Sequence, residues 1–294
     1  MRADRPSFTA AIVSFARGVG VAGAAPDPFA AVVGHPLLRA LLAARSAVGG
    51  VAPAAGEALR SVYRVMTLGM VDHATLRTLA VDRALLDGVR RGIDQLVILG
   101  AGLDTRAFRL DGLAGVDVFE VDHPASQRFK RARVAALSPA CRSHRFIPVD
   151  FERASLDGAL AAAGHDRSRP TLWLWESVAM YLTEGAVDAT LDAVSARTVP
   201  GSRLVMTYMR TGSLPFGPLG ARIIPPCFAL GGEALRSTYD PAGIRALLER
   251  RGFAVRADEN DDDWHPRYGG SPRLTRPFEG ERLVVADAAT SPVA

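Results

Sequence analysis

The sequence predicts an α/β fold in which helices cover both faces of a mostly parallel β-sheet. From residue 93 onward, short apolar runs alternate with stretches of helical pattern, as strand–helix–strand units do. Several runs end in a glycine or an acid, and ligands bind at the carboxyl ends of strands in such sheets. Residues 1–92 show no strand pattern. We therefore expect a helical N-terminal extension over 1–92 and a sheet domain over 93–294.

The N-terminal extension has the composition of helices joined by loops. Alanine and leucine dominate it, and it is interrupted by prolines that include Pro26, Pro28, Pro36 and Pro53. Its last helix is predicted at about 72–91, where apolar residues recur at three-to-four spacing. These residues are Leu76, Leu79, Ala80, Leu86 and Val89.

Five short apolar runs predict the first five strands. They cover 95–100, 116–122, 145–150, 171–176 and 202–208. Helices are predicted between them at 124–137, 153–163 and 184–198. After a break, a helix at 240–251 and short strands at 253–257 and 281–287 resume the alternation.

Two segments are long for simple connections, namely 209–239, which is rich in Gly and Pro, and 258–280. We expect both to be insertions that form a lid. Within the second, the run Asp261-Asp262-Asp263 lacks the spacing of a calcium loop and is interpreted as a solvated turn, so no metal site is predicted.

The charge balance argues against a nucleic-acid partner. The chain has 35 Lys+Arg and 31 Asp+Glu, a net charge of +4, and an aromatic content of 7%. A nucleic-acid binder usually concentrates its charge on one face and interleaves stacking aromatics. The short basic runs here have neither property.

The cysteines and the N-terminus point to a cytoplasmic protein. Cys141 and Cys227 form no CxxC pair, which excludes a four-ligand zinc site and a disulfide framework. Arg17 cuts short the apolar stretch 10–16, so we do not interpret it as a signal peptide. No window has the roughly 18 apolar residues of a membrane helix.

A glycine-containing turn directly after the first strand is the central motif. Gly100 allows a tight turn, Gly102 lets a ligand approach the backbone, and the next helix would offer free N–H groups. An ordinary strand-to-helix turn is the alternative. A dinucleotide-binding motif would have its third glycine where Thr105 stands, and Asp104 would repel a pyrophosphate. The turn suits a ligand with a cationic head and no phosphate.

Acids at the ends of the next strands extend this site. Asp122 lies 20 residues after Gly102, at the position where an acid binds ribose hydroxyls, and Glu120 is on the same face of the strand. Asp150 is placed to bind an adenine amino group, with Phe151 either stacking on the ring or packing in the core.

Glu176 ends an apolar strand after two tryptophans and needs a partner there, either a ligand ammonium or an internal arginine. Together these residues predict a pocket for a nucleoside with a cationic tail. S-adenosylmethionine has these groups and no phosphate.

Four strings carry a resemblance to a known family: VILGAGLDTRAFRL (97–110), FEVDHP (119–124), VDF (149–151) and LWESVAMYL (174–182). Over about 72–209 the sequence resembles the leucine carboxyl methyltransferase family, whose bacterial branch includes polyketide O-methyltransferases related to tetracenomycin C methyltransferase. The resemblance implies a Rossmann-like, class I S-adenosylmethionine-dependent fold of about seven strands, the last antiparallel, with a helical N-terminus and lid.

The resemblance also implies which residues bind the cofactor. These are Arg77, Gly100, Ala101, Gly102, Asp104, Thr105, Arg106, Glu120, Asp122, Asp150, Phe151 and Glu176. Arg77 would hold the cofactor carboxylate, and Tyr181 would face the reacting centre. The family's string resembles R-T-R-F-F-D-D, whereas this chain has RTLAVDR at 77–83, so the second arginine and both aromatics are absent. That departure puts the shape of the lid or acceptor wall in question.

Methyl transfer from a sulfonium to oxygen is an in-line displacement that depends mainly on positioning. A carboxylate acceptor needs no base, whereas a phenol or alcohol does. His123, beside Asp122, is the one histidine to test as a base. Tyr181 and Tyr208 are either acceptor-orienting hydroxyls or core aromatics. Candidates to bind an anionic acceptor are Arg210, Arg222 and Arg267.

The sequence therefore predicts an S-adenosylmethionine-dependent O-methyltransferase acting on a carboxyl or hydroxyl group of a small secondary-metabolite acceptor. Two alternatives stay open: a nicotinamide-dependent oxidoreductase on the same sheet, and a cofactor-binding protein without turnover. No nucleic-acid or membrane partner is expected, and a homodimer is an open option.

Overall fold

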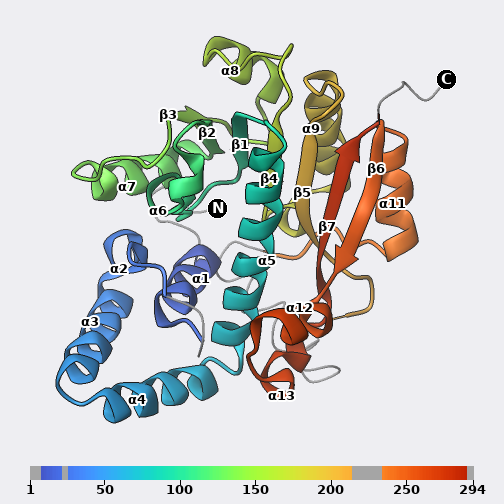
Figure 1. The fold of residues 1–294 in the computed structure, drawn as a ribbon. Helices are drawn as coiled ribbons and strands as arrows, with labels where there is room; N and C mark the ends of the chain where they lie inside the picture. The colour runs from blue at the N-terminus through green and yellow to red at the C-terminus, as the bar shows by residue number, and fades with distance from the viewer. Residues whose placement is uncertain (1–7, 22–25, 214–233, 290–294) are drawn as a thin grey trace.

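The computed structural model describes residues 8–21, 26–213 and 234–289. Its centre is a seven-stranded sheet with the strand order β3-β2-β1-β4-β5-β7-β6 (Figure 1). The strands are β1 Gln95–Leu99, β2 Asp117–Asp122, β3 Ser143–Pro148, β4 Leu172–Trp175, β5 Arg203–Met209, β6 Phe253–Glu259 and β7 Glu281–Ala288. β1 to β5 pair in parallel, and β7 is antiparallel to both β5 and β6. The predicted α/β fold with an antiparallel last strand is confirmed.

The central strands are buried on both faces, which explains their continuous apolar sequence. Every residue of β1, β4 and β5 is buried. Side chains alternate between the two faces, so Val97 and Leu99 belong to one core while Leu96 and Ile98 belong to the other. The sheet thus separates two hydrophobic cores.

Helices cover the two faces of the sheet. α8 Leu156–Ala162, α9 Glu184–Ala196 and α11 Pro241–Glu249 pack into the first core, whereas α5 Met70–Arg90, α6 Arg106–Arg109 and α7 Pro124–Val134 pack into the second. Thr183, the predicted start of α9, caps that helix by accepting the N–H of Ala186. α7, α8, α9 and α11 lie within their predicted ranges and are shorter, whereas α5 begins two residues before its predicted start.

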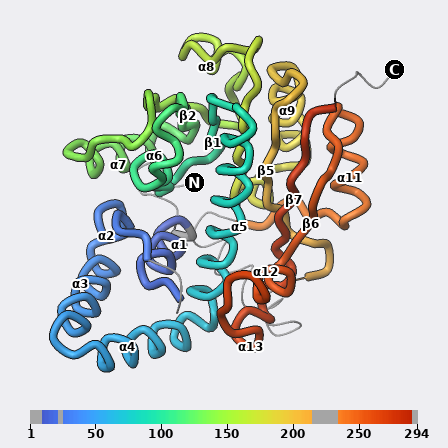
Figure 2. The backbone as a smooth tube through the Cα atoms, viewed as in Figure 1, coloured from blue at the N-terminus to red at the C-terminus, as the bar shows by residue number. Residues whose placement is uncertain are grey.

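The N-terminal helices form a third, smaller core. They are α1 Phe8–Val19, α2 Ala30–Val33, α3 Pro36–Val51 and α4 Pro53–Met66. α1 packs against α5, while α3 and α4 form a hairpin that lies away from the sheet in the tube view (Figure 2). α5 crosses the sheet face and joins this helical part to the strands.

The segment 258–280 folds beside α5. It contains α12 Asp261–Tyr268, α13 Pro272–Thr275 and a 3₁₀ turn, Arg276–Phe278. The contact is close at Gly69, which has a φ of +89° and where a Cβ would lie 1.9 Å from the carbonyl oxygen of Leu274. Only glycine fits there. Asp261 is fully buried, so our interpretation of 261–263 as a solvated turn is wrong for this residue.

Candidate active site

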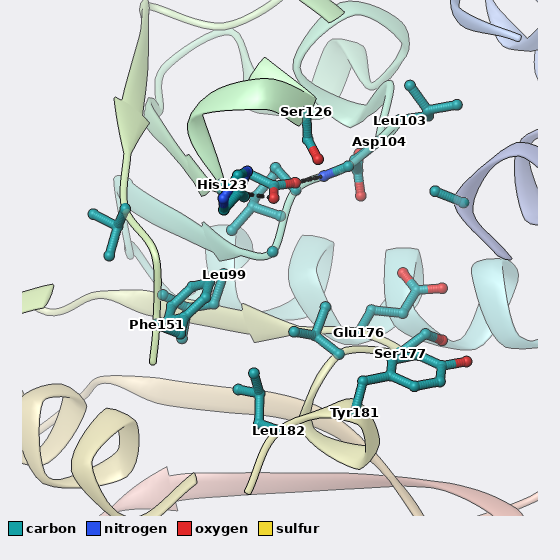
Figure 3. Close-up of a pocket in the computed structure, with 18 of the residues that line it drawn as sticks. Leu99, Leu103, Asp104, His123, Ser126, Phe151, Glu176, Ser177, Tyr181 and Leu182 are labelled. Atoms are coloured by element: carbon teal, nitrogen blue, oxygen red, sulfur yellow. Dashed lines mark hydrogen bonds between the residues drawn. The ribbon is translucent and has the colours of Figure 1, made fainter. Parts of the chain in front are cut away.

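A cavity of about 570 Å³ opens at the carboxyl ends of β1, β2 and β4 (Figure 3). Its walls come from four parts of the chain: helix α1, Arg77 of α5, the strand ends with their following loops, and residues 234 and 236. Ten of the predicted site residues line it: Arg77, Gly100, Ala101, Gly102, Asp104, Asp122, Asp150, Phe151, Glu176 and Tyr181. The predicted edge of the sheet is therefore where the cavity lies.

The glycine turn is fixed by backbone hydrogen bonds to β2. The N–H groups of Gly100 and Ala101 both donate to the carbonyl of Val121, at 2.8 and 3.0 Å. Gly100 has a φ of +68°, and a Cβ there would lie 2.3 Å from the Val178 side chain. Glycine is required at this position for both reasons.

Asp122 joins the end of β2 to this turn. One carboxylate oxygen accepts the N–H of Gly102, and the other accepts the N–H of His123 at 2.5 Å. Burial raises the pKa of Asp122, and the two backbone donors oppose that shift. A carboxylate has about four acceptor positions, so Asp122 keeps capacity for a ligand hydroxyl in the cavity.

Glu120 lies on the same strand but has a different role. Its carboxylate pairs with Lys130 of α7 at 2.5 Å and with His144 of β3 at 3.1 Å, and its side chain is 1% exposed. It does not line the cavity. Our expectation that Glu120 contacts the ligand is therefore not supported, because α7 supplies its partner beneath the surface.

Asp150 and Phe151 form one wall of the cavity after β3. Asp150 accepts the N–H of Glu152 at 3.1 Å, and its side chain remains 34% exposed. Phe151 is half-buried, with part of its ring against the core and part facing the cavity (Figure 3). The ring of Phe151 therefore packs against the core and is also accessible to a ligand in the cavity, so the two predicted roles are compatible.

Glu176 ends β4 between two arginines. Its carboxylate accepts from Arg77 at 2.9 Å and from Arg106 at 2.7 Å. Burial opposes its ionisation, but Arg106 and Arg77 outweigh burial and lower the pKa of Glu176. The internal arginine pairing that we considered is thus present.

Arg77 retains a donor for a ligand. It is 2% exposed and also donates to Glu281 at 2.5 Å. Its second terminal nitrogen, Nη2, is buried and has no hydrogen-bond partner among the described residues. Since Arg77 lines the cavity and an unpaired buried donor is costly, a ligand anion fits this position.

A comparison with protein families agrees with this geometry. The family model described as leucine carboxyl methyltransferase matches residues 20–195 of this chain. The chain belongs to the leucine carboxyl methyltransferase family. The match contains the glycine turn, Asp122 and Glu176, so the residues that carried the resemblance lie inside it.

Similar proteins from actinobacteria share most of this region. One from Mycobacterium avium is 39% identical over 201 residues, 67% of this chain and 62% of its own length. One from Mycolicibacterium paratuberculosis is 34% identical over 229 residues, 70% of this chain and 74% of its own length. Both are named "Putative S-adenosyl-L-methionine-dependent methyltransferase". The match to the first relative thus spans less than two thirds of that relative's length.

Solved structures share the fold. A DUF574 family protein from Streptomyces avermitilis superposes with a TM-score of 0.61 at 13% identity, covering 96% of this chain and 98% of that one. A Thermobifida fusca protein, titled a "putative methyltransferase", gives a TM-score of 0.59 at 18% identity, covering 97% and 96%. At such identities the likeness concerns the fold alone.

Two predicted cofactor residues of this family member lie behind the cavity wall. Arg106 is fully buried and bonds Asp82 at 2.6 Å as well as Asp104 and Glu176. Thr105 is also fully buried and donates its hydroxyl to Asp27. Neither lines the cavity, so direct contact with a ligand is not supported for them. They hold the turn in place.

Asp104 lines the cavity but its charge is already paired. It forms an ion pair with Arg106 and accepts that residue's N–H at 2.7 Å. Burial opposes its ionisation, but Arg106 outweighs burial and holds the pKa of Asp104 well below its usual range. The net negative charge expected in the turn is thereby reduced.

Sequence reasoning missed Arg17 as a site residue. It comes from α1, is 6% exposed, lines the cavity and donates through Nη2 to the carbonyl of Leu103 at 2.8 Å. Its Nε is buried without a hydrogen bond to any described residue. The only signal was a single arginine that interrupts an apolar stretch, which we used for localisation alone.

Tyr181 and Tyr208 differ in position. Tyr181 lies in the 3₁₀ turn Ala179–Tyr181 and faces the cavity with Ser177 and Leu182 (Figure 3). Tyr208 is 1% exposed, and its hydroxyl donates to Asp258 at 2.8 Å, outside the cavity lining. The acceptor-orienting role considered for Tyr208 is therefore wrong.

Two of the three arginines predicted to bind an acceptor, Arg210 and Arg267, do not line the cavity. Arg210 donates to Ser213 at 2.8 Å, Arg267 pairs with Glu259 at 2.7 Å, and Arg222 lies outside the described residues. Arg153 and Arg236 line the cavity instead. His123 lines it too and caps α7 by accepting the N–H of Ala125 at its Nδ1.

A buried network of charges extends from the cavity to β7 and α12. His73 of α5 bonds Asp261 at 2.8 Å and Glu281 at 2.9 Å, and Glu281 also pairs with Arg77. Burial lowers the pKa of His73, but Asp261 and Glu281 outweigh burial and raise it to about 9. The sequence did not indicate these partners of His73, because Asp261 and Glu281 lie 188 and 208 residues away along the chain.

In the described ranges, no group of three or more His, Cys, Asp or Glu residues is arranged to hold a metal ion. Among those same residues, no helix has the length and hydropathy needed to cross a bilayer.

Proposed function

We propose that this chain is an S-adenosylmethionine-dependent methyltransferase that methylates an oxygen of a small-molecule acceptor. The observation that carries the proposal is Asp122 at the end of β2, bonded to the Gly102 N–H inside the cavity. A glycine turn and an acid on adjacent parallel strands form a nucleoside-binding edge. The names of the actinobacterial relatives support the same activity.

The residues present fit this cofactor. Gly102 leaves space in the cavity, and the nearest atom to a Cβ placed there is 3.6 Å away. We assign Asp122 to the ribose hydroxyls, and Asp150 with Phe151 to the adenine. The Nη2 of Arg77, which has no hydrogen-bond partner among the described residues, is assigned to the methionine carboxylate. The guanidinium of Arg17, whose Nε lies 3.9 Å from the carboxylate of Asp27, is assigned to the same group. Glu176, whose carboxylate is paired with Arg77 and Arg106, is assigned to hold the Arg77 side chain in place for that contact.

When bound, the cofactor supplies a methyl group on an already activated sulfonium. The chain's contribution is to hold the acceptor oxygen in line with that methyl group and to exclude water. Tyr181 and Leu182, on the wall opposite the glycine turn, are assigned to the acceptor side of the cavity. The Nδ1 of His123 accepts a backbone N–H, so a role as base would fall to its Nε2.

A carboxylate acceptor fits better than a hydroxyl within this proposal. Arg153 and Arg236 line the cavity and are 85% and 53% exposed, so both are accessible to an incoming anion. A carboxylate is ionised at neutral pH and requires no base. An oxidoreductase is disfavoured, since Asp104 and Thr105 occupy the turn where a pyrophosphate would bind.

Transfer of a labelled methyl group tests the proposal. The purified chain is incubated with methyl-labelled S-adenosylmethionine and matched panels of aryl carboxylic acids and phenols. Methyl esters or ethers in the product support it, and esters alone support the carboxyl assignment. Cofactor binding without transfer to any acceptor would favour the silent cofactor-binding protein, and reduction of a nicotinamide cofactor would favour the oxidoreductase.

A further inference from the structure

The outer side of the α3–α4 hairpin is an exposed apolar surface. Among the described residues, all the large hydrophobic side chains classed as exposed lie within 37–68. They are Leu37, Val48, Val51, Val62, Val65, Met66 and Leu68, with exposed fractions from 39% to 90%. Concentration of exposed apolar side chains in one hairpin marks an interaction surface rather than scattered surface residues.

These residues form a stripe along each helix. On α3 the exposed stripe consists of Leu37, Ala40, Ala44, Val48 and Val51, at intervals of three and four. On α4 it consists of Ala55, Ala58, Val62, Val65 and Met66, again at intervals of three and four, apart from the adjacent last pair. Such spacing places each set on one side of its helix. No charged or polar residue interrupts either stripe.

The inner side of the same hairpin is already packed. Leu42 and Tyr63 are buried in the small core with α1, and the Tyr63 hydroxyl donates to the carbonyl of Leu41 at 3.1 Å. The two helices approach closely where Gly49 meets Gly56, since a Cβ on Gly56 would lie 2.6 Å from the Cα of Gly49. The hairpin is thus a defined two-helix layer whose inner side is covered and whose outer stripes are open.

We propose that the outer stripes of α3 and α4 pair with the same stripes of a second copy of this chain, forming a four-helix interface. At 1.5 Å per residue, the 16 residues of α3 span about 24 Å, and two helices side by side are about 20 Å wide. Two such faces bury about 1,000 Å² in total, which is the lower limit for a specific interface.

The composition favours a second copy over a lipid surface. The stripes lack tryptophan and phenylalanine, which anchor helices that lie on a bilayer. Their alanines allow close helix approach and leave space for Val62 and Val65 of the partner as knobs. A two-fold axis sets these uncharged stripes against each other, and two-fold dimers are the commonest assembly.

Sedimentation equilibrium of the full chain tests this interface. The expected species has twice the chain mass of 31.2 kDa. In the double variant Val48→Glu/Val62→Glu, each stripe carries a buried charge in the dimer, and the dissociation constant is expected to rise at least 100-fold. The matched control compares Val48→Glu with Ser46→Glu: both add one charge at an exposed position of α3, but Ser46 lies on the opposite side of the helix from Leu37, so Ser46→Glu leaves the dimer intact.

Folding and alternative partners are checked in the same series. Leu37→Glu/Met66→Glu changes the exposed ends of the stripes, at 65% and 73% exposure, and is expected to give a monomer with an unchanged melting temperature. A monomeric wild-type chain overturns the proposal. So does a dimer that persists in both stripe variants. A monomer that co-sediments with anionic phosphatidylglycerol vesicles would instead identify the stripes as a lipid-binding surface.

Discussion

Four acidic residues near the cavity form two groups that differ in their hydrogen-bond partners. At the front of the cavity, Asp122 and Asp150 accept mainly backbone N–H groups and keep oxygen atoms open to a ligand. At the back, Glu176 and Glu281 are closed by ion pairs to Arg77 and, for Glu176, to Arg106. An acid at a strand end therefore keeps oxygen atoms for a ligand only where no buried arginine or lysine is paired with it. Arg153, which lies 3.9 Å from Asp150, is 85% exposed.

The acids at the back of the cavity also matter more for the stability of the fold than those at the front. Its charges are buried and connect α5, β4, β7 and α12, so each depends on its partners for its ionised state. Removing one partner leaves an uncompensated buried charge, whereas removing a front acid changes little in the packing. The two regions should respond differently to substitution.

Arg77→Met is expected to give the largest effect on stability. The substitution removes the ion-pair partner that Glu176 and Glu281 share. Because both carboxylates are buried, we expect the unfolding free energy to fall by about 3–5 kcal/mol. Urea denaturation measures this, with Arg267→Met at the surface as the control. A loss below about 1 kcal/mol for Arg77→Met would show that the back region is not structural.

The ion pairs of His73 predict that the free energy of unfolding depends on pH, with a change of similar size. The folded-state pKa of His73 is raised from 6.5 to about 9, so its stabilisation is fully present below pH 6.5 and lost as the pH rises through 9. The expected loss is about 3 kcal/mol. Denaturation at pH 6.5, 8 and 9.5 measures it, and His73→Gln should remove the dependence. If the unfolding free energy of the wild type and of His73→Gln fell equally with pH, the raised pKa of His73 would not be its cause.

Arg17→Met sharpens the comparison at the cavity itself. Loss of its guanidinium should weaken binding of S-adenosylhomocysteine about tenfold, because one charge-assisted contact to the carboxylate is removed. The unfolding free energy should change less than in Arg77→Met, because Asp27, the ion-pair partner of Arg17 at 3.9 Å, also pairs with Arg109 and accepts the hydroxyl of Thr105. Unchanged affinity in calorimetry would remove Arg17 from the site.

Tyr208→Phe should give the smallest effect. It removes one hydrogen bond to Asp258, which keeps its pairing with Arg282, so we expect about 1 kcal/mol of destabilisation. The rate of methyl transfer should stay within a factor of two, because the hydroxyl lies outside the cavity. A tenfold loss of rate at unchanged stability would return Tyr208 to the acceptor site.

Local patterns were sufficient for the fold and for the front of the site. Continuous apolar runs identified the buried strands, and the spacing from Gly102 to Asp122 identified the adjacent strand ends. The back region could not be predicted in the same way. Whether Glu120 pairs with Lys130, or Glu176 with Arg106, depends on which helix covers each strand end. Arg17 and Asp261 likewise reach their partners only through tertiary packing.

The most direct test of the comparison is calorimetric titration of S-adenosylhomocysteine into three proteins. The wild type should bind, Asp122→Asn should bind about 100-fold more weakly, and Glu120→Gln, two residues away on the same strand, should bind as the wild type does. Circular dichroism should show all three folded, with Glu120→Gln melting at a lower temperature because the buried Lys130 loses its partner. Equal binding by wild type and Asp122→Asn, or a loss of binding in Glu120→Gln alone, would contradict the assignment of the front acids to the ligand.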